Sequence, residues 1–259
     1  MKLIIAGATG YVATELIRQS LRRPDVTSVV ALARKTVAAP ADVAGANAAK
    51  LTSVVVKDYE TGPYDDEATR KALAGADACI WTVAITPSKS SAYPFKEVRR
   101  ICQSSTLAGL RAIHGAGSNR PFRFLYMSGI AAERDQTKKP PFKPEYSLMR
   151  ATCSLRLYCG VLVLTCQGQT ENDILAYAAD HREVEPIIVK PGLITSNRLF
   201  QDWIMAPLVG VVAGVPNMPL SALATVMLDQ AINGAKADTI LAAELVQMGK
   251  DLATKQAKQ

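Results

Sequence analysis

The sequence predicts an α/β fold in which helices cover both faces of a doubly wound parallel sheet. Apolar runs of strand length alternate along the chain with segments of helical spacing, which predicts right-handed crossovers between parallel strands. The strand segments are continuous apolar runs, as expected of strands that are buried on both faces. A length of 259 residues suits one domain of this class, so we expect residues 1–259 to form a single domain.

Each element follows from its local pattern, in chain order. Residues 2–7 form a short apolar strand, and Val12, Leu16, Ile17 and Leu21 then fall on one face of a helix over 11–23. Further strands are expected over 26–34, 51–58, 77–84, 123–129 and 184–194. Further helices are expected over 67–76, 94–117 and 170–181.

Composition and charge exclude several classes of function. The net charge is +7, but Lys and Arg are scattered without a basic run, which favours a small anionic ligand over nucleic acid. The five cysteines form no C-x-x-C pair and the two histidines have no carboxylate cluster beside them, so we expect reduced thiols, a cytoplasmic location and no metal. The apolar run 203–215 is shorter than a membrane span and contains Pro207, so no membrane association is expected.

The segment GATGYVA, residues 7–13, joins the first strand to the first helix. Gly7 allows a tight turn, Gly10 allows the backbone to approach a pyrophosphate, and the helix start offers free N–H groups. Ala13 stands at the usual third glycine position and is small enough to keep helix and strand close. The position between a strand and an amphipathic helix favours a dinucleotide site over a mere tight turn.

The end of the second strand predicts the choice of cofactor. A site selective for NAD would carry an acidic residue there for the ribose hydroxyls, whereas this chain has Arg34 and Lys35. A guanidinium suits a 2′-phosphate, so we expect NADP(H) rather than NAD(H); a solvated basic pair is the alternative. Asp58 is placed to meet the adenine edge, or is a surface acid. Thr82, Val83 and Ala84 face the cofactor, or belong to the core.

These landmarks resemble the short-chain dehydrogenase/reductase superfamily, in its atypical single-domain NAD(P)-binding branch of oxidoreductase-like and NmrA-like proteins. The resemblance runs from GATGYVA through YMSGI to VKPGLI and implies a Rossmann-type fold. It implies that Ser128 is the active-site serine and that Pro191 and Gly192 touch the nicotinamide end. Together with the residues above, the cofactor site it implies comprises Gly7, Thr9, Gly10, Tyr11, Val12, Arg34, Lys35, Asp58, Thr82, Val83, Pro191 and Gly192.

The superfamily's catalytic signature is Tyr-x-x-x-Lys on the helix after the serine, and this chain has Tyr146 and Arg150 at that spacing. Tyr146 would then exchange a proton with the substrate oxygen while Ser128 orients the carbonyl. Arginine keeps a positive charge near the phenol but cannot exchange protons near neutral pH. The alternative is a surface tyrosine on a helix without activity.

An interruption separates the two halves of this signature. Residues 168–171, GQTE, would normally follow the catalytic pair directly, but the 17 residues of 151–167 stand between them and include Cys153, Cys159 and Cys166. A continuous helix through 17 extra residues would rotate the second half by about −100° relative to the first. Retained non-coding sequence, a lineage-specific loop and a redox feature of the cysteines are the alternatives for this insertion.

We therefore expect an NADP(H)-dependent oxidoreductase or epimerase-like enzyme that acts on a small carbonyl or hydroxyl compound. The part from about 195 to 259 is expected to cover the substrate cleft. A small-molecule substrate is the expected partner, and the chain would be a monomer or homodimer. The alternative function is a non-catalytic regulator or sensor that binds NADPH.

Overall fold

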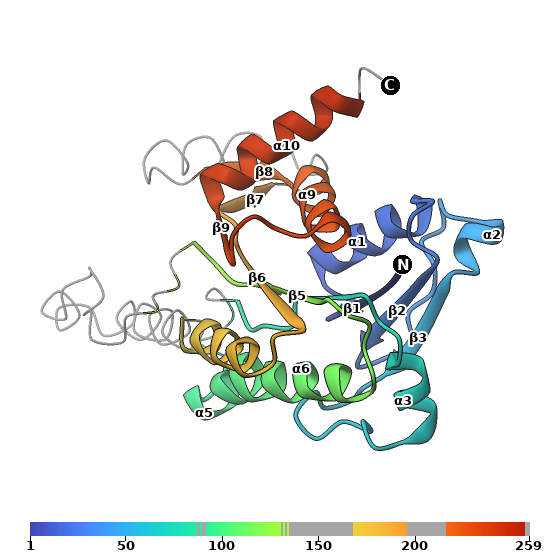
Figure 1. The fold of residues 1–259 in the computed structure, drawn as a ribbon, viewed down its shortest axis with the longest axis vertical. Helices are drawn as coiled ribbons and strands as arrows, with labels where there is room; N and C mark the ends of the chain where they lie inside the picture. The colour runs from blue at the N-terminus through green and yellow to red at the C-terminus, as the bar shows by residue number, and fades with distance from the viewer. Residues whose placement is uncertain are drawn as a thin grey trace, which may run out of the picture.

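The computed structural model describes residues 1–86, 89, 92–130, 132, 134, 168–195 and 216–256. Seven parallel strands form one sheet in the order β3-β2-β1-β4-β5-β6-β9 (Figure 1). These strands are β1 (Lys2–Ala6), β2 (Ser28–Ala33), β3 (Leu51–Val55), β4 (Ala78–Trp81), β5 (Phe122–Met127), β6 (Val184–Lys190) and β9 (Thr239–Leu241). The predicted Rossmann-type sheet is confirmed, and its strand order reverses direction between β1 and β4.

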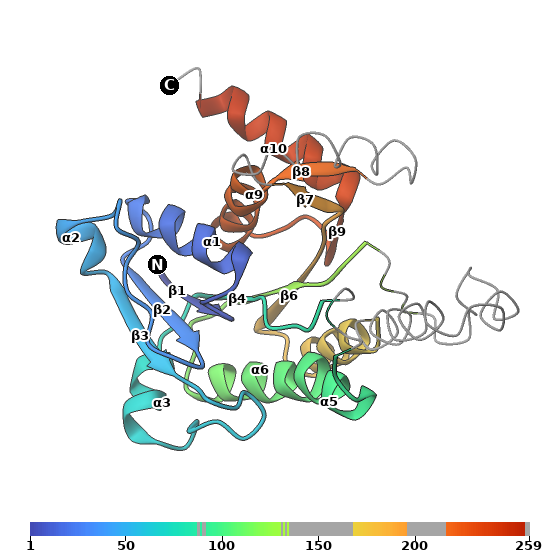
Figure 2. The same cartoon turned by 180° about the vertical axis from the view of Figure 1, so that it is seen from behind.

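Helices lie on both faces of the sheet, as Figures 1 and 2 show. One face carries α1 (Tyr11–Arg22), α9 (Leu220–Asn233) and α10 (Ala242–Gln256). The other carries α3 (Glu67–Leu73), α5 (Phe95–Arg99), the π-helical turn η1 (Arg100–Ser104), α6 (Ser105–Gly115) and a helix over 168–180. A short helix, α2 (Gly45–Ala48), precedes β3. The helix expected over 94–117 is therefore present in three joined parts.

Alternate residues of each strand enter two separate core layers. In β1, Leu3 and Ile5 pack with α1 and α9, whereas Ile4 and Ala6 pack toward α6 and the helix over 168–180. All four of these side chains are fully buried, as predicted for a strand that is covered on both faces. Trp81 is also fully buried and packs against Gly109 of α6, where an added Cβ would come within 2.1 Å of the indole ring.

The C-terminal part corrects one expectation. The strand expected over 184–194 ends at Lys190, because Pro191 offers no N–H to continue the ladder, and residues Leu193–Thr195 form a separate strand, β7, that pairs with β8 (Asn217–Pro219). The expectation that about 195–259 covers the substrate cleft stays a prediction, and the described residues 216–256 have a second role in the sheet. They supply β9 as the seventh strand of the sheet, and α9 packs on α1. Residues 196–215 lie outside the described part.

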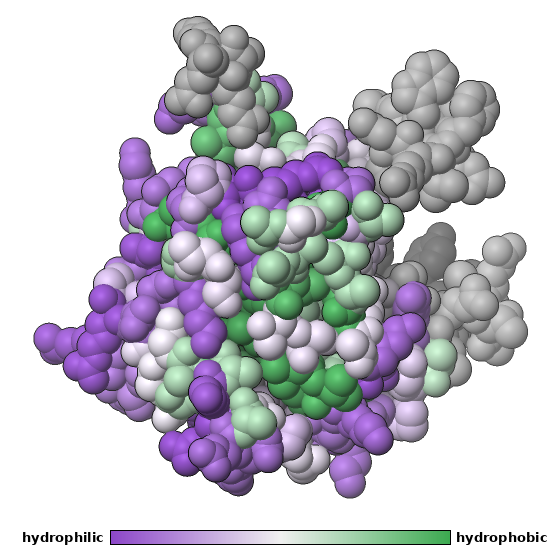
Figure 3. Space-filling model, turned by 90° about the vertical axis from the view of Figure 1, so that its right-hand side faces the viewer, coloured by the Kyte–Doolittle hydropathy of each residue, from purple (hydrophilic) through white to green (hydrophobic). Residues whose placement is uncertain are grey.

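The side of the molecule that carries α2 and β3 shows apolar residues gathered in its middle with hydrophilic residues around them (Figure 3). β3 is the edge strand of the sheet, and Val55 on it is exposed. Among the described residues, no helix has the length and apolar character needed to cross a membrane.

Candidate cofactor and active site

The glycine-rich turn after β1 has a conformation and a close packing that favour glycine. Gly7 has a φ of 78°, and a Cβ at this position would come within 2.7 Å of Thr82 Oγ1. A Cβ on Gly10 would come within 3.0 Å of the Gly7 carbonyl oxygen. Gly10 is also the N-cap residue of α1. It has no side chain that could accept a hydrogen bond from the first N–H groups of this helix. Such a helix start is suited to an anion.

The side chain of Tyr59 contacts this turn and holds it by a hydrogen bond. Its hydroxyl donates to the Leu32 carbonyl at 2.9 Å and accepts from the Gly7 backbone N–H at 3.3 Å. The ring packs edge-on against Trp81, with 5.6 Å between the ring centroids. Burial raises the pKa of Tyr59 to about 12, so the hydroxyl stays protonated and keeps donating to Leu32 at neutral pH.

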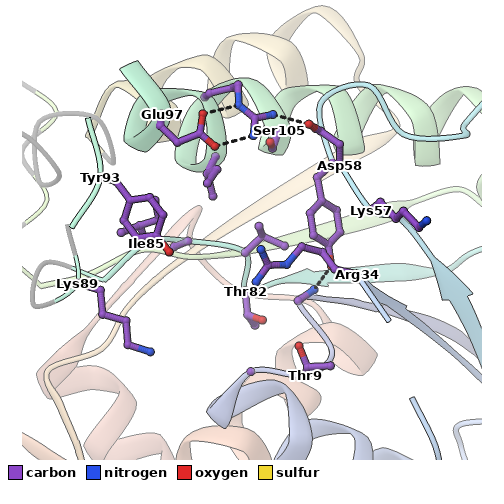
Figure 4. Close-up of a pocket in the computed structure, with 17 residues that line it drawn as sticks. Thr9, Arg34, Lys57, Asp58, Thr82, Ile85, Lys89, Tyr93, Glu97 and Ser105 are labelled. Carbon is purple, nitrogen blue, oxygen red and sulfur yellow. Dashed lines mark hydrogen bonds and ion pairs between the residues drawn. The ribbon is translucent and has the colours of Figure 1, made fainter. Parts of the chain in front are cut away.

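A cavity of about 350 Å³ opens at the carboxyl ends of β1 to β4 (Figure 4). Ligands of open α/β sheets bind at such a point, outside the strand ends and beside the reversal of strand order. The strand ends supply Gly7, Arg34, Asp58 and Thr82 to the lining. The helical segment that begins with α5 supplies Glu97, Arg100, Ile101 and Ser105 from the opposite side.

Three cations in the cavity lining, Arg34, Lys57 and Lys89, form no ion pair within the described part of the chain. Figure 4 shows Arg34 extending into the cavity and Lys57 at its edge. Uncompensated positive charge around a partly enclosed space attracts a ligand with several negative charges. The sequence placed Arg34 correctly next to this space, but it gave no signal for Lys57 or Lys89.

A cluster of ionic residues lies at the β3 end of the cavity. Arg100 donates from Nε and Nη2 to the two carboxylate oxygens of Glu97 at 2.8 and 2.7 Å, and from Nη1 to Asp58 Oδ2 at 2.6 Å. Glu60 Oε2 lies 3.5 Å from Nη1. The hydrogen bonds from Arg100 lower the pKa of Glu97, so both groups are charged at neutral pH. The predicted adenine-edge acid, Asp58, is therefore already engaged by a side chain that the sequence did not single out.

Ser128 follows β5 directly and is tied to a buried carboxylate. Its hydroxyl donates to Glu171 Oε1 at 2.5 Å, and its backbone N–H donates to the Val189 carbonyl at 2.9 Å. Glu171 is fully buried, and Lys190 Nζ lies 3.1 Å from the same oxygen. A serine hydroxyl has one proton to donate, so Ser128 in this arrangement offers only lone pairs to a further partner.

The buried Glu171 carboxylate joins several elements. Arg134 donates from Nε to Glu171 Oε2 at 2.6 Å and from Nη2 to Thr239 Oγ1 at 2.7 Å. Lys190 donates to the Ala132 carbonyl at 2.6 Å. The network thus connects β5, β6, β9 and the helix over 168–180. The sequence identified Glu171 as part of a helical signature, but its partners come from distant segments and could not be predicted.

The structure brings some of the predicted cofactor residues together and leaves others apart. Gly7, Thr9, Gly10, Arg34, Asp58, Thr82, Val83 and Ala84 all line the cavity. Tyr11, Val12, Lys35, Pro191, Gly192 and Ser128 do not; Tyr11 and Lys35 are exposed, and the Val12 side chain belongs to the core beside α9. The lining residues that sequence reasoning missed include Tyr59, Tyr93, Glu97 and Arg100. Tyr146, Arg150 and the insertion 151–167 lie outside the described residues.

Residues 7–197 match the family described as NAD(P)H-binding, and the chain belongs to this family. The structure fits that cofactor class, because the glycine turn has no room for side chains and the cavity lining carries cations without an ion-pair partner among the described residues. The predicted resemblance to the atypical NAD(P)-binding short-chain dehydrogenase/reductases is confirmed by this family match together with the fold. No curated protein matches the sequence significantly.

Solved structures with a similar fold include two enzymes of sugar nucleotides. A dTDP-glucose 4,6-dehydratase from Streptomyces venezuelae, solved with NAD bound, has a TM-score of 0.60 and 15% identity over 98% of this chain and 81% of that chain. A UDP-N-acetylglucosamine 4-epimerase from Methanobrevibacter ruminantium M1 has a TM-score of 0.60 and 12% identity over 98% and 82% of the two chains. At these identities, the likeness concerns the fold.

Proposed function

We propose that this chain is an NADPH-preferring oxidoreductase or epimerase-like enzyme that acts on a small carbonyl or hydroxyl compound. The observation that carries the cofactor preference is Arg34, which extends into the cavity directly after β2 without an ion-pair partner in the described part of the chain. A 2′-phosphate there would gain charge-assisted hydrogen bonds from the guanidinium. Lys57 and Lys89 add positive charge around the same cavity.

A pair of matched variants tests this preference. Arg34→Asp is expected to erase or invert the preference for NADPH over NADH, because it replaces the phosphate partner with a ribose-binding acid. Lys35→Asp makes the same change of charge at the adjacent exposed residue, which does not line the cavity, and should keep the preference. The measurement is the dissociation constant of each cofactor by fluorescence titration. An unchanged preference in Arg34→Asp would contradict the assignment.

The geometry of the helix over 168–180 supports a catalytic role for Tyr146. Glu171, Ile174 and Ala178 are buried on one side of this helix. If 151–167 were removed and the helix continued backward, Arg150 would stand four residues and Tyr146 eight residues before Glu171. At about 100° per residue these positions fall within about 80° of Glu171, on the same side as Ile174 and Ala178. Without the insertion, both signature residues would therefore share the sheet-facing side of the helix.

In the proposed reaction the cofactor supplies or accepts the hydride. Tyr146 donates a proton to the substrate oxygen when a carbonyl is reduced and takes it back in the reverse direction. Arg150, one turn along, keeps positive charge near the phenol and favours its ionised form. Ser128, whose proton is held by Glu171, would accept a hydrogen bond from a hydroxyl rather than donate one to a carbonyl.

The catalytic assignment is tested at Tyr146. Tyr146→Phe should leave NADPH affinity within about threefold while turnover falls by about 10²-fold or more, in line with general acid–base contributions. Arg150→Lys should keep or raise activity, because lysine is the usual partner in the superfamily. Cofactor oxidation with a panel of small carbonyl compounds is the readout. Equal turnover in Tyr146→Phe and the wild type would refute the role.

A non-catalytic NADPH-binding regulator is the second candidate. Two observations favour it: the Ser128 proton is already donated to Glu171, and 17 residues separate Arg150 from Gly168. This function predicts NADPH binding without turnover of any carbonyl or alcohol, even in Arg150→Lys that also lacks 151–167. Turnover of a carbonyl or alcohol by the wild type would exclude it, whereas activity gained only by the combined variant would show that the catalytic helix is interrupted by the 17 residues. For either function we propose a reducing compartment such as the cytoplasm, because the buried Cys79 and Cys102 are free thiols.

A further inference from the structure

The Arg100 guanidinium at the β3 end of the cavity has an arrangement that the proposed function does not use. All three of its nitrogens are bonded to carboxylates, two to Glu97 and one to Asp58, as the dashed lines of Figure 4 mark. Glu60 lies near the same Nη1. Since N–H groups of a guanidinium lie in its plane, these carboxylates occupy the edge of the group and fix its orientation.

The occupied edge limits what Arg100 can offer to a ligand. Arg100 lines the cavity and keeps 32% of its side chain exposed, so part of it remains open to a ligand. Because three of its five N–H donors are hydrogen-bonded to carboxylates and Glu60 lies near Nη1, the group presents mainly its flat face and its aliphatic stem. Flat guanidinium faces stack on aromatic rings, which are attracted by the positive charge.

The charge around Arg100 argues against a phosphate at this place. The three carboxylates of Asp58, Glu60 and Glu97 surround one guanidinium, so the cluster keeps a net negative charge. A phosphate would be repelled there, whereas it is favoured beside Arg34, which has no such neighbours in the described part of the chain. A neutral aromatic ring with an amino group fits both the flat cation and the surrounding acceptors.

We propose that Arg100 recognises the adenine base of the cofactor by stacking, and that Asp58 and Glu97 act as positioning residues that hold its guanidinium plane. This inference rests on the proposed binding of NADPH in this cavity. In this arrangement two different cations contact the adenosine moiety: Arg34 binds the 2′-phosphate and Arg100 stacks on the base. Arg100 therefore contributes equally to NADPH and NADH and does not set the choice between them.

The test uses the full chain and four probes: NADPH, NADH, 2′,5′-ADP and nicotinamide mononucleotide. Arg100→Met keeps an unbranched apolar stem as far as the position of Nε but removes the flat cation. It should weaken NADPH, NADH and 2′,5′-ADP by a similar factor of about 5 to 30, the range of a partly desolvated cation–π contact. Nicotinamide mononucleotide, which has no adenine, should bind unchanged. Isothermal titration calorimetry gives all four affinities.

A second variant separates stacking from charge. Arg100→Lys keeps a positive charge that can still approach a ring, but it has no flat face and no planar fork for Asp58 and Glu97 to hold, so it should also lose affinity, although less than Arg100→Met. Full affinity in Arg100→Lys would overturn the proposal, as would a loss confined to NADPH and 2′,5′-ADP, which would make Arg100 a phosphate ligand. An equal loss for nicotinamide mononucleotide would show a structural role instead. Failure of the wild type to bind NADPH would reject the proposed function itself, and the Arg34→Asp titration tests that separately.

Discussion

Removing the charge of Glu171 should destabilise the protein strongly. Glu171 is fully buried, and its carboxylate lies 3.1 Å from Lys190 Nζ and 2.6 Å from Arg134 Nε. Glu171→Gln leaves the Lys190 ammonium, whose side chain is only 9% exposed, without its buried counter-ion. Breaking a buried ion pair from one side costs about 3 to 5 kcal/mol. For a chain of this size that corresponds to a melting temperature lower by about 6 to 20 °C.

The control for this variant is Glu185→Gln. Glu185 also pairs with an arginine, Arg123, at 3.1 Å, but its side chain is 48% exposed, so the loss should stay below about 1 kcal/mol. Thermal unfolding followed by circular dichroism compares the two variants with the wild type. If the melting temperature falls no further in Glu171→Gln than in Glu185→Gln, the buried network does not stabilise the fold.

Three further outcomes follow from the packing and the sequence. Gly109→Ala should lower the free energy of unfolding by about 1 to 3 kcal/mol in a denaturant titration, because its Cβ would meet Trp81, whereas Gly115→Ala, with no atom within 4 Å, should not. Burial raises the pKa of Tyr59 to about 12 from 10.0. The contribution of the protonated hydroxyl to stability is therefore complete below pH 10 and is lost as the pH rises toward 12. The free energy of unfolding of Tyr59→Phe should accordingly fall less than that of the wild type between pH 8 and about pH 11. Deletion of 151–167 should give a folded protein with a higher melting temperature, and a variant that fails to fold would show that the segment is structural.

The sequence predicted β1 to β6 and the helices up to 181 other than α2 because their cause is local, but it did not predict the two C-terminal helices α9 and α10. The apolar runs of β1, β2, β4, β5 and β6 and the spacing of Val12, Leu16 and Leu21 in α1 reflect the burial of each segment, whereas β3 at the sheet edge is only partly buried. β9 and β8 are three residues long, and strands of that length carry too little pattern to be recognised. β6 ends at Lys190 because Pro191 follows. The apolar residues on both sides of this position had predicted one strand over 184–194.

The site was predicted where backbone chemistry defines it and missed where distant side chains meet. Gly7 and Gly10 follow from the turn that a βα junction requires, and Arg34 follows from its place after β2. Arg100 reaches the cavity because of where the helical segment crosses the strand ends, and that depends on the whole sheet. The hydrogen bond from Ser128 to Glu171 joins residues 43 positions apart, so no local pattern could reveal that the serine hydroxyl already donates to a carboxylate.

The most direct test of the central claim is the relative affinity of the full-length wild type for NADPH and NADH, measured by titration at one ionic strength. Arg34, which lines the cavity and has no ion-pair partner among the residues that the structure describes, predicts that NADPH binds at least tenfold more tightly, which corresponds to about 1.4 kcal/mol. Equal affinities, or tighter binding of NADH, would contradict the account.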